Sequence, residues 1–445
     1  MGSDRRIVVT GLGLATPIGI GVDVFWDALL SGHSGIARIV AFDPSGFDSQ
    51  IAGELPEFKL TDFIPKRYRK SVKVMSRDIT VAMIAAYHAV IDAGLKTLCI
   101  IERGEAEGEP NVDSTRFGAN IGAGLVCADL TELAAALITA VEDGRFSLKK
   151  WGAEGMQNLT PLWLLKFLPN MLACHVTIVH DAQAPCNTIP CGEASSHLAI
   201  GEAYRTLQRG AADVCICGGA ESKANPTALA TPQVLKRLNT KSNDAPESAS
   251  RPFTETSTGS VIAEGGGLVI LETLDHARAR NARIYAEVVG FGSSTNAISW
   301  SAPDPSGRGY ALAIRRALAD ADIAADAIDL IGAFGTGIRD YDAAEAKAWG
   351  DVFGDALPET SALTTRGGIG VCGAGAGAID FAAVTLALHH NTVPPSINTS
   401  PPMTDCRLRF ESDGPADARI RAAITLGHAI DGGQSAALVI RGFEE

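Results

Sequence analysis

The chain has 445 residues, 46% of them hydrophobic and 20% charged, and a formal net charge of −13 at pH 7. This composition supports a large folded core and excludes intrinsic disorder, and the length predicts two domains or one large duplicated domain. The negative charge argues against nucleic-acid binding, which depends on a basic surface. Because no apolar run is long enough to span a membrane and the N-terminus is unlike a signal peptide, we expect a cytoplasmic protein without membrane contact.

The cysteines and glycines predict neither a metal site nor a cofactor. Nine cysteines are scattered without the paired spacing of zinc ligands, so we expect reduced thiols, with Cys215 and Cys217 in the core. A G-x-G pattern at residues 11–13 follows an apolar run. Thr16 and Pro17, however, stand where a dinucleotide-binding loop would continue into its helix, so we reject that interpretation.

In the first half of the chain, apolar periodicity predicts alternating strands and helices. Residues 6–10 are rich in β-branched side chains and predict a buried strand that ends at Gly11. Residues 159–172 are unusually apolar and aromatic, which indicates core packing or, alternatively, a subunit interface or pocket wall. The other expected strands are 117–121 and 212–217, and the expected helices are 22–31, 76–94, 127–141 and 194–208.

The second half repeats this order. Strands are expected at 267–271, 284–290, 330–332 and 436–441, and helices at 310–322, at 342–350 and after a Gly-rich turn at 367–377. The alternation predicts an α/β fold. Two half-chains, residues 1–250 and 251–445, fit this order better than two unrelated modules.

Residues 190–196 (PCGEASS) place a carboxylate, Glu193, where a strand ends and a buried helix begins. Free N–H groups and the helix dipole favour negative charge there, and such junctions commonly hold a nucleophile. Cys191 is a candidate for a shifted nucleophile. We expect it on the preceding strand, away from the helix start, and therefore inactive.

Several motifs occur in an order that resembles the thiolase-fold ketosynthases of fatty-acid and type II polyketide synthesis. They are RIVVTGLG (6–13), GAADVCICGGAES (210–222), SRPF (250–253), EGGG (264–267), Gly335-Thr336 with Asp342 and Glu345, and VPPSIN (393–398). The resemblance covers nearly the whole chain. It implies a thiolase fold, with duplicated α/β halves in a five-layer αβαβα arrangement.

The catalytic positions depart from that family. Its members use a cysteine nucleophile and two histidines that assist decarboxylation. By resemblance, Glu193 occupies the cysteine position, Phe334 and Val371 the histidine positions, and Arg366 a lysine position. A carboxylate attacks a thioester only to form a mixed anhydride, and Phe and Val donate no hydrogen bond. The loss of all three groups predicts that condensation is lost.

The resemblance therefore implies a chain length factor, also called a ketosynthase β subunit, which forms a heterodimer with a catalytic ketosynthase and shapes its chain tunnel. The residues expected at the tunnel and interface are Leu130, Leu133, Leu137, Phe167 and Leu168, with ordinary core packing as the alternative. Glu193 is expected to accept N–H groups at the helix start and to pair with Arg366. His428 is expected to be structural or to line the pocket.

The basic run Lys66, Arg67, Arg69 and Lys70 is conspicuous in an acidic chain. By resemblance it lies near the docking mouth for a transiently bound acyl carrier protein; the alternative is a solvated loop. Two other functions remain open. One is a malonyl-carrier decarboxylase, or another altered acyl-processing enzyme, with Glu193 as general acid or base. The other is an acyl- or carrier-binding homodimer.

Overall fold

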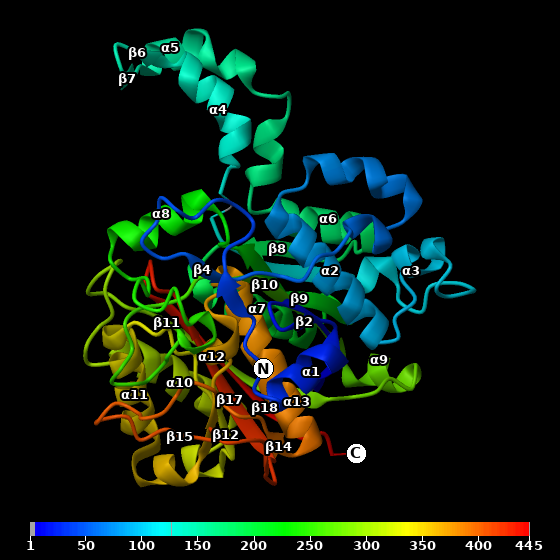
Figure 1. The fold of residues 1–445 in the computed structure, drawn as a ribbon. Helices are drawn as coiled ribbons and strands as arrows, with labels where there is room; N and C mark the ends of the chain where they lie inside the picture. Colours follow the sequence, from blue (N-terminus) through cyan, green and yellow to red (C-terminus); the bar gives the residue numbers. More distant parts are fainter. Residues whose placement is uncertain (1–4, 126, 445) are drawn as a thin grey trace.

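The computed structural model describes residues 5–125 and 127–444 (Figure 1). A twelve-stranded mixed sheet has the order β15-β13-β12-β17-β18-β11-β1-β10-β9-β5-β8, with β2 paired to β1. Its strands are β1 (Ile7–Thr16), β2 (Gly19–Ile20), β5 (Phe117–Ala123), β8 (Cys186–Ile189), β9 (Val214–Ser222), β10 (Glu264–Thr273), β11 (Ala286–Thr295), β12 (Leu330–Gly332), β13 (Ser361–Leu363), β15 (Arg409–Phe410), β17 (Ala422–His428) and β18 (Gln434–Arg441).

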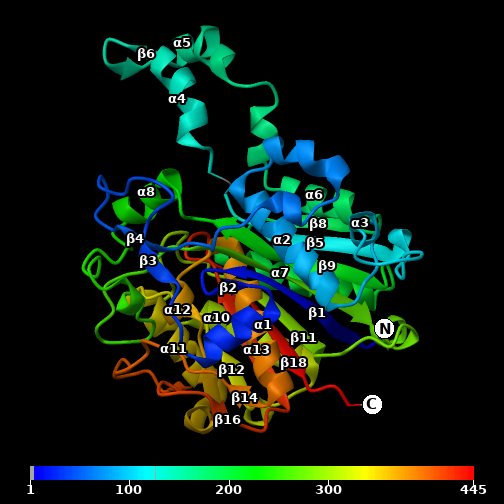
Figure 2. The ribbon, with the colours of Figure 1, turned by 45° about the vertical axis from the view of Figure 1, so that its right-hand side comes forward.

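Helices cover the sheet in layers (Figures 1 and 2). Helix α2 (Arg77–Asp92) packs on β1, β9 and β10, and α10 (Arg308–Ala321) packs on β11 and β18. Between the halves, α7 (Ser195–Gln208) contacts β5 and β9, α13 (Ala376–His390) contacts β10 and β17, and the two helices contact each other. This succession of helix and sheet layers confirms the predicted thiolase-like α/β fold, whereas the division at residue 250 stays a prediction.

The remaining elements connect and flank these layers. The other α-helices are α1 (Val22–Leu30), α3 (Leu98–Arg103), α4 (Leu130–Thr139), α5 (Leu148–Ala153), α6 (Met171–His180), α8 (Pro226–Val234), α9 (Leu274–Ala279), α11 (Arg339–Phe353) and α12 (Arg366–Ile369). Short strand pairs are β3 (Ile36–Arg38) with β4 (Ile51–Gly53), β6 (Val141–Glu142) with β7 (Arg145–Phe146), and β14 (Thr392–Val393) with β16 (Ala416–Asp417). In the described chain, no helix is long and apolar enough to cross a membrane.

Strand β1 does not end at Gly11, so that prediction was wrong. The strand continues to Thr16, with a register shift between Val9 and Gly11 opposite β10. A Cβ at Gly11 would lie 2.4 Å from the carbonyl oxygen of Ala89, a residue of α2. Glycine here serves close helix–sheet packing rather than chain reversal.

The nine cysteines are free thiols, and the expected core position of two of them is confirmed. Cys215 and Cys217 are fully buried within β9. Burial raises the pKa of Cys215 to about 12. Both side chains therefore behave as small apolar core groups.

An arm, residues 129–167, stands away from the body in both views (Figures 1 and 2). It comprises α4, the β6–β7 hairpin, α5 and the 3-10 turns η4 (Gly155–Asn158) and η5 (Trp163–Phe167). Asp143 and Gly144 form the hairpin tip with φ of 50° and 71°, a conformation typical of an Asp-Gly turn. Core packing was therefore the wrong expectation for much of residues 159–172, because Leu162 and Leu164 are more than half exposed.

Candidate functional site

Glu193 lies in the short turn η6 (Gly192–Ala194) between β8 and α7 and is 3% exposed. Its Oε1 lies 3.0 Å from Nζ of Lys223. Its Oε2 accepts the backbone N–H of Ile430 at 2.9 Å, from the loop that follows β17. The predicted pairing of Glu193 with Arg366 was wrong, because Lys223 takes that role.

The surroundings keep the Glu193 carboxyl ionised. Burial raises its pKa, but the charge of Lys223 and the hydrogen bonds from Ile430 and Lys223 outweigh burial and hold the pKa below its usual value. The pKa of Lys223 is raised above its usual value because Glu193 and Glu221 outweigh burial. The pair is thus an ion pair at neutral pH, and Glu193 has no proton to donate.

Lys223 was missed by the sequence analysis. It follows the end of β9 directly, its side chain is 25% exposed, and its Nζ lies 3.9 Å from Glu221. Glu221 in turn accepts the N–H of Ala374 at 2.6 Å. A lysine just after a buried strand whose penultimate residue is a glutamate was the available signal, since the end of such a strand is a natural place for the counter-charge of that acid.

Arg366 and Phe334 form a second buried cluster. The Arg366 side chain is completely buried and makes an ion pair with Asp380 of α13. Its Nη1 donates to Thr365 at 2.9 Å. Its guanidinium carbon lies 4.6 Å from the centre of the Phe334 ring, a cation–π contact. Arg366 and Phe334 therefore pack against each other within the core and do not face a cavity.

His428 is structural. It is completely buried, its Nε2 lies 3.2 Å from a carboxylate oxygen of Glu345, and its ring stacks on Tyr310 at 4.4 Å. Glu345 also accepts the N–H groups of Phe334 and Gly335. His428 therefore helps to shape the turn at Phe334 and is absent from the lining of the pocket beside Glu193.

A pocket of about 220 Å³ adjoins Glu193 and Val371, whereas Phe334 lies outside its lining. Its charged side chains are Glu193, Glu221, Lys223, Arg237 and Asp431. These charges satisfy one another, since Arg237 also pairs with Asp431 at 2.7 Å. Chemically, the pocket offers an ionised, hydrogen-bonded carboxylate where a nucleophile would be needed, and that group is a weak base at neutral pH.

Cys191 is not arranged as a nucleophile. From the sequence, we expected Cys191 on the strand, but it lies beyond the end of β8. Its N–H donates to Ser195 Oγ at 2.8 Å. Burial raises the pKa of its thiol, so the thiolate is disfavoured.

A second groove, of about 560 Å³, runs from the pocket to the base of the arm. The two share Cys127 and Thr227 in their linings. Leu130 and Phe167 line this groove, whereas Leu133, Leu137 and Leu168 do not. The structure thus brings two of the five expected tunnel residues to one cavity next to the Glu193 pocket.

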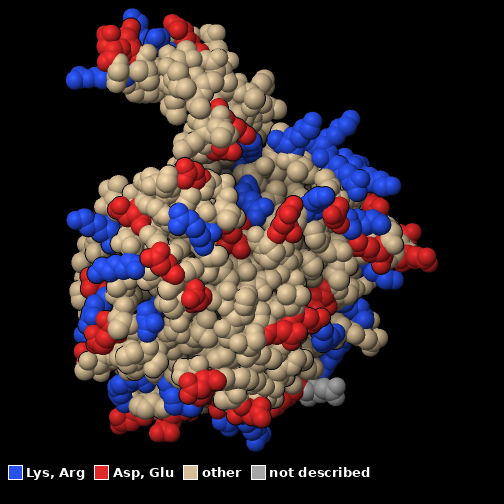
Figure 3. Space-filling model, viewed as in Figure 1, with Lys and Arg blue, Asp and Glu red and all other residues tan. Residues whose placement is uncertain are grey.

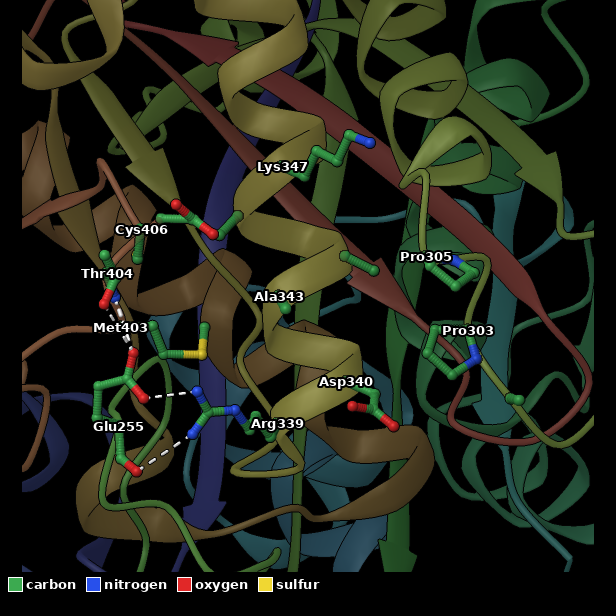
Figure 4. A pocket seen from close by; sticks show the side chains of 14 residues that line it. Glu255, Pro303, Pro305, Arg339, Asp340, Ala343, Lys347, Met403, Thr404 and Cys406 are labelled. Carbon is green, nitrogen blue, oxygen red and sulfur yellow. Dashed lines mark hydrogen bonds and ion pairs between the residues drawn. The ribbon is translucent and has the colours of Figure 1, made fainter.

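A larger pocket of about 900 Å³ lies elsewhere, between α11 and the segment that carries Pro303 and Pro305 (Figure 4). Arg339 there pairs with Glu255 at 2.6 Å, and Thr404 also donates to Glu255. Its lining contains none of the four residues that the sequence analysis expected at altered catalytic positions. Among the described residues, no group of His, Cys, Asp or Glu has the arrangement of a metal site.

The basic run lies on η2 (Lys66–Val74), and Lys66, Arg67, Arg69 and Lys70 are all exposed. Arg67 pairs with Glu102 at 2.8 Å. Basic side chains gather beside the base of the arm (Figure 3). This local positive surface contrasts with the net charge of −13.

Comparison with known proteins identifies the family. Residues 4–277 match the beta-ketoacyl synthase N-terminal domain, and residues 285–400 match the beta-ketoacyl synthase C-terminal domain. The chain is 32% identical to "3-oxoacyl-[acyl-carrier-protein] synthase 2" of Coxiella burnetii, with 99% of each chain covered. It is 33% identical to "Putative polyketide beta-ketoacyl synthase 1" of Streptomyces halstedii, with 98% of each covered.

Solved structures agree. The ishigamide ketosynthase/chain length factor has a TM-score of 0.83 at 28% identity, over 99% of this chain and 100% of that one. A type II polyketide synthase acyl-carrier protein in complex with its ketosynthase has a TM-score of 0.83 at 26% identity, with the same coverage. The chain belongs to the beta-ketoacyl synthase family.

Proposed function

We propose that this chain is a non-catalytic ketosynthase-like subunit, of the chain length factor kind, that pairs with a catalytic ketosynthase. The observation that carries the proposal is the state of Glu193: an ionised carboxylate bound by Lys223 and by the Ile430 amide. With Phe334 and Val371 at the two expected histidine positions, nothing there attacks a thioester or stabilises an enolate.

The arm supports the pairing. Exposed apolar area of this extent is typical of an interface rather than of a free surface. Its exposed apolar side chains are Leu130, Leu137, Ile138, Val141, Phe146, Leu148, Met156, Leu162, Leu164 and Leu165. Strand β8 ends the sheet beside this region, and an edge strand offers unpaired backbone groups to another chain. In this proposal, Leu130 and Phe167 form part of a tunnel wall completed by the partner.

Acyl carrier proteins would contact this subunit only transiently. The exposed run Lys66, Arg67, Arg69 and Lys70 is suited to an acidic carrier because charge complementarity raises the rate of encounter. The decarboxylase alternative is less favoured, since the lowered pKa of Glu193 leaves no proton for acid catalysis.

The experiment is purification of the chain alone and after co-expression with a ketosynthase that has its nucleophile and both histidines. We expect a stable one-to-one complex, and a chain that is insoluble or monomeric without the partner, measured by size-exclusion chromatography with light scattering. A stable homodimer that does not bind the ketosynthase would favour the acyl- or carrier-binding homodimer instead.

A further inference from the structure

The loop of residues 429–433, between β17 and β18, crosses the Glu193 pocket. Ile430 and Asp431 both line that pocket. The Ile430 N–H donates to Glu193, and its carbonyl oxygen accepts the hydroxyl of Tyr341 at 2.6 Å. Both backbone polar groups of Ile430 are therefore held by side chains from other parts of the fold.

The next loop residues are held by an exposed ion pair and by backbone hydrogen bonds, one of which joins the Asn296 N–H to the Gly433 carbonyl at 2.7 Å. Asp431 pairs with Arg237, but its side chain is half exposed, so water screens that ion pair. Gly432 donates its N–H to the carbonyl of Trp300 at 2.7 Å. Gly432 and Gly433 have φ of 96° and 76°, in the region that favours glycine. Glu193 supplies the buried, charge-assisted anchor of this loop.

The groups around Glu193 form a binding site for a carboxylate. A lysine ammonium and a backbone N–H converge on its two oxygens. Loss of the Glu193 side chain would leave the Ile430 amide buried without its acceptor, and Lys223 with only the more distant Glu221. Such unsatisfied donors favour either loop opening or binding of another small anion.

We propose that Lys223 and the Ile430 amide form a carboxylate-binding site whose resident ligand is the chain's own Glu193, and that this internal ligand latches the 429–433 loop closed over the pocket. This goes beyond the subunit role, because the latch operates within one chain. The ligand class that could replace Glu193 is a small carboxylate such as formate or acetate.

Hydrogen–deuterium exchange of the full chain tests the latch. In Glu193→Ala, exchange at peptides covering the 429–433 loop is expected to rise about tenfold or more, as expected for loss of a hydrogen bond to a charged group. Formate at millimolar concentration is expected to restore protection in Glu193→Ala and to have no effect in Glu193→Ala/Lys223→Met. Glu202→Ala, which removes an exposed pair with Arg209, is the matched control and leaves the loop unchanged.

The variant Lys223→Met keeps the proposal testable if Glu193→Ala does not fold, since it weakens the same latch and is expected to raise exchange in the same peptides. Unchanged loop protection in Glu193→Ala, or in Lys223→Met, would overturn the latch. Equal effects of formate with and without Lys223 would overturn the carboxylate site. Neither result depends on whether a ketosynthase partner binds.

Discussion

The Arg366 guanidinium lies over the ring of Phe334, with 4.6 Å between its central carbon and the ring centre. Both residues stand at positions that a catalytic ketosynthase uses for chemistry, by the resemblance of their motifs. Here they contact each other inside the core, and Arg366 also forms an ion pair with Asp380. The two side chains are therefore part of the packed core.

Arg366→Leu is expected to lower the free energy of unfolding by about 3–5 kcal/mol, because Asp380 is then left buried without its counter-charge. Urea unfolding measures the change. Arg421→Leu, which breaks an exposed pair with Asp329, serves as the control and is expected to have a much smaller effect on the free energy of unfolding, because water screens that pair. Equal costs for the two variants would contradict the structural role of Arg366.

Ile138→Asp on the arm is expected to weaken binding to a catalytic ketosynthase by about tenfold or more, because it would bury a charge in the interface. Ile138 is 72% exposed in the isolated chain, so the melting temperature of the chain alone should not change. Val24→Asp, on α1 away from the arm, is the control. Binding measured by calorimetry that is unaffected by Ile138→Asp would remove the arm from the interface.

Lys66→Glu/Arg69→Glu is expected to lower the affinity for an acidic carrier protein severalfold in low salt, with a smaller effect in high salt because exposed charges are screened. Fluorescence anisotropy with labelled carrier measures this. The control is Lys241→Glu at another exposed position, which changes the net charge by the same amount as each single substitution of the double variant. If the affinity is the same in all three proteins, docking does not use η2.

The Glu193–Lys223 pair predicts a pH dependence of stability. The pKa of Glu193 in the folded chain lies below its usual 4.5, so its contribution is complete above that pH and is lost as the pH falls through the lower folded value. The charged groups around it in the pocket are Lys223, Glu221, Arg237 and Asp431. The difference in unfolding free energy between the wild type and Glu193→Gln should therefore be constant from pH 7 to 5 and shrink below pH 4.5. A difference that grows as the pH falls would contradict a lowered pKa of Glu193 in the folded chain.

Most elements of the fold could be predicted because β-branched runs and helical apolar faces are local signals. Helices 22–31 and 76–94 are confirmed as α1 and α2 within two residues. The end of β1 was misplaced because Gly11 and Gly13 admit α2 closely, a reason invisible without the helix beside them.

The site was only partly predictable. The order of motifs predicted Glu193, Phe334 and Val371 as site positions, and the structure brings Glu193 and Val371, but not Phe334, to one pocket. Ion-pair partners were not predicted because they depend on how the layers stack. Arg366 lies fourteen residues before its partner Asp380, and Glu193 lies 237 residues from the amide that binds it. No local pattern specifies such long-range contacts. For the same reason, only Leu130 and Phe167 of the five expected tunnel residues line the groove.

The most direct test of the central claim is carbon dioxide release from malonyl-carrier protein, together with carbon–carbon bond formation, by the chain alone and in complex with a ketosynthase. The proposed role predicts neither activity from the chain alone, and loss of product when the nucleophilic cysteine of the partner is replaced. Carbon dioxide release by the chain alone that Glu193→Gln abolishes would contradict it.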